Sequence, residues 1–471
     1  MLRSRHKLIG VAVAVAFIAM GCSSSKKASS GPTTTSNGST TSGAPTTAPS
    51  GAESGKTPVN VKASQAVKND PLTGTPGSGL TRGVTATSVK VGCFGQISQF
   101  AGLEDGIKAR LTRANAAGGV AGRTINFTGC QDDGSSTQQN LQLARQLVEQ
   151  NQVFATMGVS ANMLSGTTDY LNQNQVPFFG WGFLPGFCGT RWGFGYNGCL
   201  ISDDTSLAHG VLQANLADAM VKASGLQPSA VRAGFSAGDD DSGKIGNIGY
   251  NKIYKQRGLN IVYSEANVPA PGPPADFSPF VNAILAANPN ILLVSTAFPS
   301  VAGMHAALAA AGYKGFAVNF TDYVPGLLDA SPQLASSLEG AYISSQIVPQ
   351  EQNTEWTQQE SKDLMAVNAK AGGLITLGAA IGYAEAEMFV EQLQAIGQNL
   401  NTKTFDDTIN GGSFTFAPPQ SGGPGVLQYP SGHQIPADCA AIMKVVNKKY
   451  VVQLPFQCYD SPIVRGTGAT P

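Results

Sequence analysis

The stretch from residue 100 to residue 159, FAGLEDGIKARLTRANAAGGVAGRTINFTGCQDDGSSTQQNLQLARQLVEQNQVFATMGV, decides the fold class of this chain. Apolar residues recur at helical spacing over 103–117, and Gly118 and Gly119 then end the predicted helix. RTINFTGC is predicted as a strand, and a second helix over 137–150 leads into the strand VFATMGV. Because strands alternate with helices, this stretch predicts a parallel sheet covered by helices.

The same alternation extends outward in both directions. VKVGCFG is the strand upstream and VPFFGWG is the strand downstream, around a helix near 162–173. After residue 202 the pattern restarts, with these elements: helix 206–223, strand 230–236, helix 243–257, strand 259–265, helix 277–287, strand 290–295, helix 300–311 and strand 315–320. Two runs, over about 385 residues after residue 76, predict an α/β protein of two Rossmann-like lobes. Open sheets of this kind bind ligands beyond the carboxyl ends of their strands.

The N-terminus has the pattern of an export signal. A basic head (Arg3, Arg5, His6 and Lys7) precedes the apolar run 8–20, which is too short to span a bilayer well. Gly21 then stands before Cys22, an arrangement that resembles the lipobox of bacterial lipoproteins, although Ala19 replaces the usual leucine. The resemblance implies removal of residues 1–21 and attachment of lipid to Cys22. The alternative is an ordinary cleaved signal followed by a stray cysteine.

Residues 22–82 form a predicted linker. The composition is Ser, Thr, Gly, Pro and Ala with almost no large apolar residue, so it cannot bury enough surface to offset its ordering entropy. A flexible chain of this kind has an r.m.s. reach of roughly 40 Å. We interpret it as a disordered spacer, the alternative being a low-complexity tail without a role.

Charge and cysteine content narrow the class of protein. The formal net charge is zero and only 13% of residues are charged, which favours neither nucleic-acid binding nor a basic membrane surface. Six cysteines remain once Cys22 is set aside, and an even number in an exported chain predicts disulfides. Of the fifteen pairings, spacing favours Cys93–Cys130, Cys188–Cys199 and Cys439–Cys458. A zinc site is disfavoured because there is no CxxC motif and the histidines are scattered.

The opening stretch resembles type I periplasmic binding proteins, nearest to the leucine/isoleucine/valine receptors of ABC importers. The likeness covers about 75 residues in order and spacing, and the strand–helix rhythm extends it to about residue 460. The residues that carry it are Asn115, Gly118 to Val120, Gly122, Arg123, Asp132 to Gly134, Leu147 to Glu149, and Gly158. It implies two lobes that close over a small solute, joined by three crossings, which we place near 203, 347 and 413.

The resemblance also implies domain limits and ligand contacts. The first lobe would comprise 83–203 and 347–412, the second 204–346 and 413–460, and a tail 461–471. The expected ligand-binding residues are Ser160, Ala161, Asn162, Trp181, Gly182, Phe183, Phe298, Asp322 and Tyr323. The loop 160–162 would receive a carboxylate and Asp322 an ammonium. Ser160 has helix capping as its alternative, and Trp181 has core packing.

Two of these positions depart from the family pattern. Small residues and a threonine usually follow the fourth strand, but this chain has Gly180, Trp181, Gly182 and Phe183 there. Phe298 has no hydroxyl, so one hydrogen bond of the family is missing. These departures put in doubt the contacts by which the family usually binds an amino acid, and they favour a bulkier or more apolar ligand.

GFSAG, residues 234–238, fits the nucleophile elbow of serine hydrolases, with Ser236 as the nucleophile. About 0.5 such matches are expected by chance in a chain so rich in glycine and serine, and three aspartates follow where the elbow requires a helix. We therefore expect no enzyme and no cofactor, and keep the Ser236 hydrolase as a minor alternative.

The resulting expectation is an extracytoplasmic lipoprotein, anchored on the outer face of the bacterial cytoplasmic membrane, that delivers a small molecule to an ABC permease. An amino acid or amide is the default ligand that the resemblance implies, and the partners would be solute, permease and membrane, with no nucleic acid. A receptor that senses the ligand for a membrane signalling partner is the alternative, because lobe closure would serve both roles.

Overall fold

The computed structural model describes most of the chain after residue 70. The described ranges are 71–200, 214–256, 258–270, 272–296, 298–319, 323–418, 425–437 and 439–458. In these ranges no helix is long and apolar enough to cross a membrane. The prediction of lipid at Cys22 and the predicted crossing near 203 lie outside the described residues.

The first sheet has five parallel strands in the order β2-β1-β3-β4-β5. The strands are β1 (Ser88–Gly95), β2 (Thr124–Asp132), β3 (Ala155–Met157), β4 (Phe178–Gly180) and β5 (Gly193–Gly195). The helices of this lobe are α1 (Leu103–Ala116), α2 (Thr137–Arg145) with its π-helical continuation (Gln146–Gln150), α3 (Ser165–Gln173), α10 (Glu355–Val367), α11 (Leu377–Ile396) and α12 (Thr402–Ile409). The alternation predicted over residues 100–159 is confirmed.

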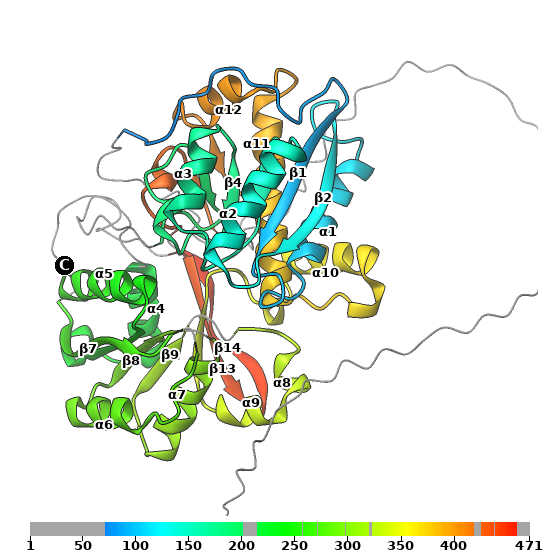
Figure 1. Cartoon of the computed structure of the whole chain (residues 1–471). Helices are drawn as coiled ribbons and strands as arrows, with labels where there is room; N and C mark the ends of the chain where they lie inside the picture. Colours follow the sequence, from blue (N-terminus) through cyan, green and yellow to red (C-terminus); the bar gives the residue numbers. More distant parts are fainter. Residues whose placement is uncertain are drawn as a thin grey trace, which may run out of the picture. The chain divides into compact units, whose positions relative to one another are not determined.

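The second sheet has seven strands in the order β14-β13-β10-β9-β8-β6-β7. The strands are β6 (Arg232–Gly238), β7 (Asn260–Val268), β8 (Ile291–Ser295), β9 (Phe316–Asn319), β10 (Tyr342–Ser345), β13 (Cys439–Val446) and β14 (Lys449–Cys458). The helices are α4 (Ala214–Ser224), α5 (Asp241–Gln256), α6 (Ser278–Ala287), α7 (Phe298–Ala310), α8 (Leu327–Ala330) and α9 (Pro332–Ser337). β13 runs antiparallel to both of its neighbours, β10 and β14, and the other strand pairs of this sheet are parallel. The two sheets confirm the predicted α/β fold with two lobes (Figure 1).

Two helices distant in sequence form the centre of the first lobe. α1 packs along α11, which is buried along most of its length. Glycines permit the close approach, because a Cβ at Gly106 would lie 2.0 Å from the Ala379 carbonyl oxygen and one at Gly382 would lie 2.2 Å from that of Leu103. The contact thus packs the chain after β10 against the first lobe.

The third passage lies later in the chain than the predicted position near 413. The short ribbon of β11 (Thr415–Phe416) and β12 (Leu427–Gln428) is followed by His433, whose Nδ1 lies 2.8 Å from the Gly193 carbonyl oxygen on β5. Pro436 still forms a bridge with Gly198, and only at Cys439 does the chain enter the second sheet as β13. The described residues 425–437 therefore pack with the first lobe, because His433 and Pro436 have their partners on β5 and in the turn after it.

Residues 71–82, which we assigned to the linker, form an ordered segment that we call the strap. The Gly77 N–H donates to Asp406 Oδ2 (2.9 Å), the Ser78 N–H donates to Gln175 Oε1 (2.8 Å), and the Leu80 N–H donates to Thr402 Oγ1 (3.0 Å). Its backbone groups thus find partners in the fold, which composition alone does not reveal. Figure 1 shows the strap in blue, passing α12.

The strap lies at the amino ends of the first sheet's strands. Arg82 donates to the carbonyl oxygen of Val153, just before β3, and Gln175 precedes β4. Thr73 exchanges backbone hydrogen bonds with Gly189 and Arg191, just before β5. Because parallel strands have their amino ends at one edge of a sheet, we call this edge of the lobe the strap end.

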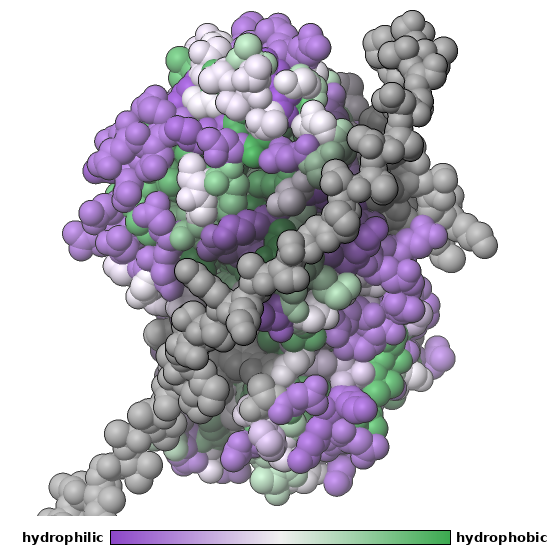
Figure 2. Space-filling model, turned by 90° about the vertical axis from the view of Figure 1, so that its right-hand side faces the viewer, coloured by the Kyte–Doolittle hydropathy of each residue, from purple (hydrophilic) through white to green (hydrophobic). Residues whose placement is uncertain are grey.

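Exposed apolar side chains are few and scattered in the described part of the chain. The large ones are Leu80, Leu164, Ile248, Met365 and Val451, each between 39% and 47% exposed. Figure 2 shows one face of the molecule, on which hydrophilic residues cover much of the surface and apolar residues lie between them. These five residues come from separate elements of the chain, and single exposed apolar residues of this kind are normal for a protein surface.

Candidate functional site

The carboxyl ends of the first sheet's strands lie opposite the strap end, and we call them the site end. Asp133 follows β2 there, and its buried carboxylate joins three segments. Oδ1 accepts the Ser135 N–H (2.9 Å), while Oδ2 accepts hydrogen bonds from Asn140 Nδ2 (2.8 Å) and the Ser160 hydroxyl (2.5 Å). Asn140 is on α2 and Ser160 follows β3, so one carboxylate holds these loops in fixed positions.

The loop 160–162, predicted to receive a carboxylate, is ordered by neighbouring polar groups. The Ala161 N–H donates to Gln96 Oε1 (2.8 Å), and the Asn162 N–H donates to Ser160 Oγ (2.9 Å). Ser160 caps no helix, since α3 begins at Ser165 with Leu164 as its N-cap. Asn162 Nδ2 is buried and has no hydrogen-bond partner among the described residues.

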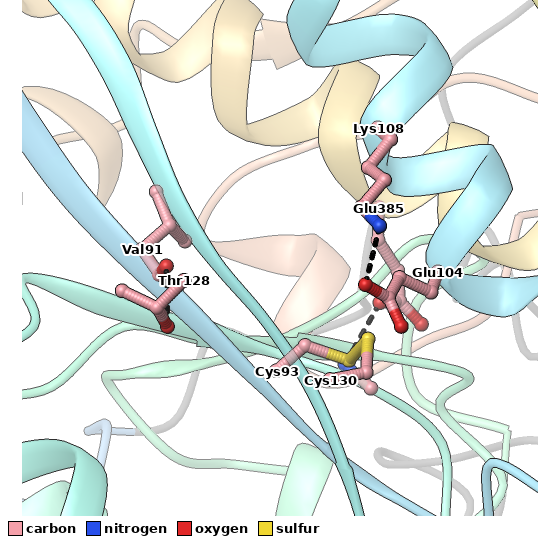
Figure 3. Close-up of a disulfide and its surroundings, with 8 residues drawn as sticks. Val91, Cys93, Glu104, Lys108, Thr128, Cys130 and Glu385 are labelled. Carbon is pink, nitrogen blue, oxygen red and sulfur yellow. Dashed lines mark hydrogen bonds and ion pairs between the residues drawn. A yellow bond between two sulfur atoms is a disulfide. The ribbon is translucent and has the colours of Figure 1, made fainter. Parts of the chain in front are cut away.

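Glu385 on α11 supports this loop. The Gly158 N–H donates to Glu385 Oε2 (2.9 Å), whereas Oε1 is buried without a partner in the described part of the chain. Burial raises the pKa of the Glu385 carboxyl well above its usual range, and the hydrogen bond from Gly158 only partly offsets this. Figure 3 shows Glu385 beside the Cys93–Cys130 disulfide that joins β1 to β2.

Three aromatic rings gather at the site end, and we call them the aromatic wall. The Trp181 ring meets Phe100 edge-on with centroids 6.4 Å apart, and meets Phe183 edge-on at 5.2 Å. Phe100 and Phe183 are partly exposed, whereas only 6% of Trp181 is exposed. The structure therefore makes Trp181 the support of the wall, close to the core packing that we gave as its alternative, and leaves Phe100 and Phe183 at its accessible edge.

Glycines hold the loop after β4 against the turn after β5. A Cβ at Gly182 would lie 1.8 Å from the Gly198 carbonyl oxygen, so no other residue fits without displacement. The Gly182 N–H also donates to Asn197 Oδ1 (3.1 Å). Gly182 thus positions the aromatic wall, and the glycine-rich GFGYNG at 193–198 serves this close packing.

Gln346, immediately after β10, was missed by the sequence analysis. Its Oε1 accepts a hydrogen bond from Trp181 Nε1 (2.8 Å) and another from Asn197 Nδ2. The side chain is 8% exposed, and its Nε2 is buried without a partner among the described residues. The available signal was its position, since Gln346 lies next to the crossing that we placed near 347; the strand β10 before it was not predicted.

Of the three ligand-binding residues predicted from the second lobe, only Tyr323 has a described side chain. Phe298 is the first residue of α7, but its side chain is not among those that the structure describes. Asp322 lies outside the described residues altogether. Tyr323 is buried, and its hydroxyl donates to Glu351 Oε2 (2.5 Å) and accepts the Gln350 N–H (2.8 Å). Both bonds tie the loop after β9 to the second crossing, so the described Tyr323 hydroxyl is occupied within the protein.

Ser236 does not form a nucleophile elbow. It lies within β6, buried and in register with Glu265 and Val294, while α5 begins only at Asp241. The two described histidines are engaged elsewhere, because His305 bonds with Asn319 and His433 with Gly193 and Asn410. Among the described residues, no histidine lies ready to act as the base for Ser236.

The disulfide predictions are confirmed for two pairs. Cys93 bonds to Cys130 and Cys188 bonds to Cys199. Cys439 is also disulfide-bonded and lies opposite Cys458 in the register of β13 and β14, so its pairing with Cys458 stays a prediction.

Comparisons with known proteins agree with this geometry. Residues 91–449 match a family model described as periplasmic binding protein. No curated protein sequence matches the chain.

Solved structures share the fold at low sequence identity. A fatty acid ABC transporter substrate-binding protein from Thermomonospora curvata has a TM-score of 0.65 at 17% identity, covering 83% of this chain and 96% of that one. An ABC transporter solute-binding protein from R. palustris, in complex with benzoate, has a TM-score of 0.58 at 14% identity, covering 79% and 98%. A branched-chain amino acid transporter substrate-binding protein from Streptococcus pneumoniae, in complex with isoleucine, has a TM-score of 0.58 at 16% identity, covering 79% and 100%.

Proposed function

Because the chain belongs to the periplasmic binding protein family, we propose that it captures a small molecule by lobe closure and delivers it to an ABC importer. The observation that carries the proposal is the built site end of the first lobe. There Trp181 and Phe183 of the aromatic wall lie on a loop held by Gly182, and the neighbouring loops are fixed by Asp133. Ligand contacts from both lobes would stabilise the closed state through their differential affinity for it.

The ligand we propose is a small carboxylic acid with an apolar body. The site end offers buried amide donors without partners among the described residues, Asn162 Nδ2 and Gln346 Nε2, and such donors call for an acceptor. Phe100 and Phe183 supply apolar surface for the body of the ligand. Fatty acids, benzoate and isoleucine, the compounds named for the three similar structures, all carry a carboxylate, and the first two lack an ammonium group.

Attachment to the membrane is part of the same proposal. Diacylation at Cys22 would hold the protein on the outer face of the cytoplasmic membrane, since each buried methylene contributes about 0.8 kcal/mol. The residues between Cys22 and the strap would give the receptor the reach to meet its permease.

Thermal unfolding of the exported chain tests the ligand class. The protein carries Cys22→Ser so that no lipid is attached, its disulfides are kept intact, and benzoate, octanoate and isoleucine are added in turn. A ligand at a hundred times its Kd stabilises the folded state by about 2.7 kcal/mol, which raises the midpoint by about 3 °C for a chain of this length.

Benzamide is the matched control, because it keeps the ring of benzoate and removes its charge. A shift with benzoate or octanoate and none with benzamide supports an apolar carboxylate. A shift with isoleucine alone keeps the receptor but removes the proposed ligand class. Absence of any shift at millimolar concentrations argues against the uptake of such solutes altogether.

A further inference from the structure

Asn197 and Gln346 join the aromatic wall to the connections between the lobes. Asn197 Oδ1 accepts the Gly182 N–H (3.1 Å), and its Nδ2 donates to Gln346 Oε1. Its carbonyl oxygen accepts the Ala437 N–H (2.8 Å). Asn197 therefore touches the loop after β4, the start of the second crossing and the end of the third.

The orientation of both amides follows from their partners. Gly182 can only donate its N–H, so Asn197 must present Oδ1 to it and Nδ2 to Gln346. Trp181 Nε1 is also only a donor. Gln346 must accordingly turn its oxygen toward Trp181 and Asn197, which leaves its own NH₂ group on the opposite side.

That NH₂ group is the second observation. Gln346 Nε2 is buried and has no partner among the described residues, and a buried unpaired donor is costly to a folded protein. Such a cost persists where the group is paired in another state of the molecule. Gln346 lies between β10 of the second lobe and α10 of the first, which is a place where a change of lobe angle moves the backbone.

We propose that Gln346 is a positioning residue that sets the balance between lobe arrangements by holding Trp181 and Asn197 through its amide oxygen. Because Trp181 supports the aromatic wall, its hydrogen bond to Gln346 couples the position of the wall's rings to the angle between the lobes. The inference rests on the proposed function, since closure matters only to a receptor, but it concerns the ligand-free protein. It involves no titrating group, so it is independent of pH.

The test measures the distance between the lobes without any ligand. Thr112→Cys on α1 and Lys314→Cys before β9 place spin labels on exposed positions of the two lobes, in the chain carrying Cys22→Ser. Double electron–electron resonance then gives the distance distribution. Gln346→Leu removes the acceptor, and we expect a shifted or second distance population in place of the parent's.

Gln392→Leu is the matched control. Gln392 is a fully buried glutamine on α11, without a hydrogen-bond partner among the described residues and away from the crossings. We expect the parent's distribution for this variant. A shift of equal size in Gln392→Leu and Gln346→Leu would show general loosening and overturn the proposal, as would no shift in Gln346→Leu.

Two milder variants keep the proposal testable if Gln346→Leu does not fold. Gln346→Glu retains an acceptor for both donors and should keep the parent's distribution; a full shift in this variant overturns the role of the acceptor. Trp181→Phe removes one donor only, and should give a smaller shift in the direction of Gln346→Leu. Ligand panels do not enter any of these measurements, so failure of the proposed ligand class and failure of this inference are distinguishable.

Discussion

The two ends of the first lobe differ in how their polar groups are paired. At the strap end, Asp406 accepts hydrogen bonds from Arg191, from the Gly77 N–H and from Asn410 Nδ2, so its carboxylate is fully engaged. At the site end, the Asp133 network lies beneath a surface where Asn162 and Gln346 each keep a buried donor without a described partner. Arg191 Nε at the strap end is also buried without a described partner, so the contrast concerns the groups that hold the strap, whose acceptor Asp406 is saturated, and the donors of the site end, which are open to another molecule or another conformation.

The largest effect is expected at the strap end. Asp406→Ala removes the partner of the largely buried Arg191 and leaves the Gly77 N–H without its acceptor, so it should lower the free energy of unfolding by about 3 kcal/mol. Urea denaturation with disulfides intact measures this. Asp407→Ala, one residue along α12 in an exposed pair with Lys403, is the control and should have little effect. An equal loss of unfolding free energy in Asp406→Ala and Asp407→Ala would show that the bonds of Asp406 to the strap add no stability of their own.

Gly182→Ala tests the packing of the site end. The added Cβ would meet the Gly198 carbonyl oxygen at 1.8 Å, so the loop must shift, at a cost of about 1–3 kcal/mol in unfolding free energy. Gly166→Ala on α3 meets nothing nearer than 4.0 Å and should be neutral or stabilising. If Gly182→Ala were as stable as Gly166→Ala, the loop would not be fixed as described.

Glu385→Gln tests whether the buried carboxyl at the site end makes the stability of the protein depend on pH. The pKa of the Glu385 carboxyl is raised by burial, so the folded state retains a proton that the unfolded state releases above about pH 4.3. Stability should therefore fall as pH rises from about 4.3 toward the folded pKa, and Glu385→Gln should remove that fall. Unfolding midpoints at pH 4 and pH 7 measure it, with Glu104→Gln as a control for loss of one acidic group that is partly exposed and paired with Lys108. A fall in stability of the same size in Glu385→Gln as in the parent would contradict the raised pKa of the Glu385 carboxyl.

The smallest change in stability is expected for Phe183→Ala, because that ring is partly exposed at the edge of the aromatic wall. Its effect should fall on binding, with about tenfold weaker affinity, or about 1.4 kcal/mol, for whichever carboxylate shifts the parent's midpoint. Isothermal titration calorimetry measures the affinity. Unchanged affinity in Phe183→Ala would show that this ring of the aromatic wall does not contact the ligand.

The sequence predicted the parts of this molecule that depend on local pattern. Helical and strand periodicity predicted the two runs of elements, because each element buries one face against its neighbours. The turn 447–448 between β13 and β14 was not among these predictions: Asn447 and Lys448 both adopt positive φ, as a tight hairpin requires, but the usual glycine is missing.

Features built from distant contacts were not predicted. The strap has the composition of a linker, and only its bonds to Asp406, Gln175 and Thr402 make it part of the fold. Residues 425–437 have no periodic pattern, so the attachment of His433 to β5 could not be predicted from the sequence. For the site, Trp181 was named from its position in a loop, but its partner Gln346 is 165 residues away in the chain.

The strap also determines where a pull on the N-terminal chain is felt. Force applied at residue 71 enters through Thr73, Gly77 and Leu80 and passes to α12 and to the amino ends of β3, β4 and β5. Every one of these contacts belongs to the first lobe. Tension therefore strains the strap's own row of hydrogen bonds and produces no torque between the lobes. For a protein held by its N-terminus, opening and closing would proceed with the same energetics whether the tether is slack or taut.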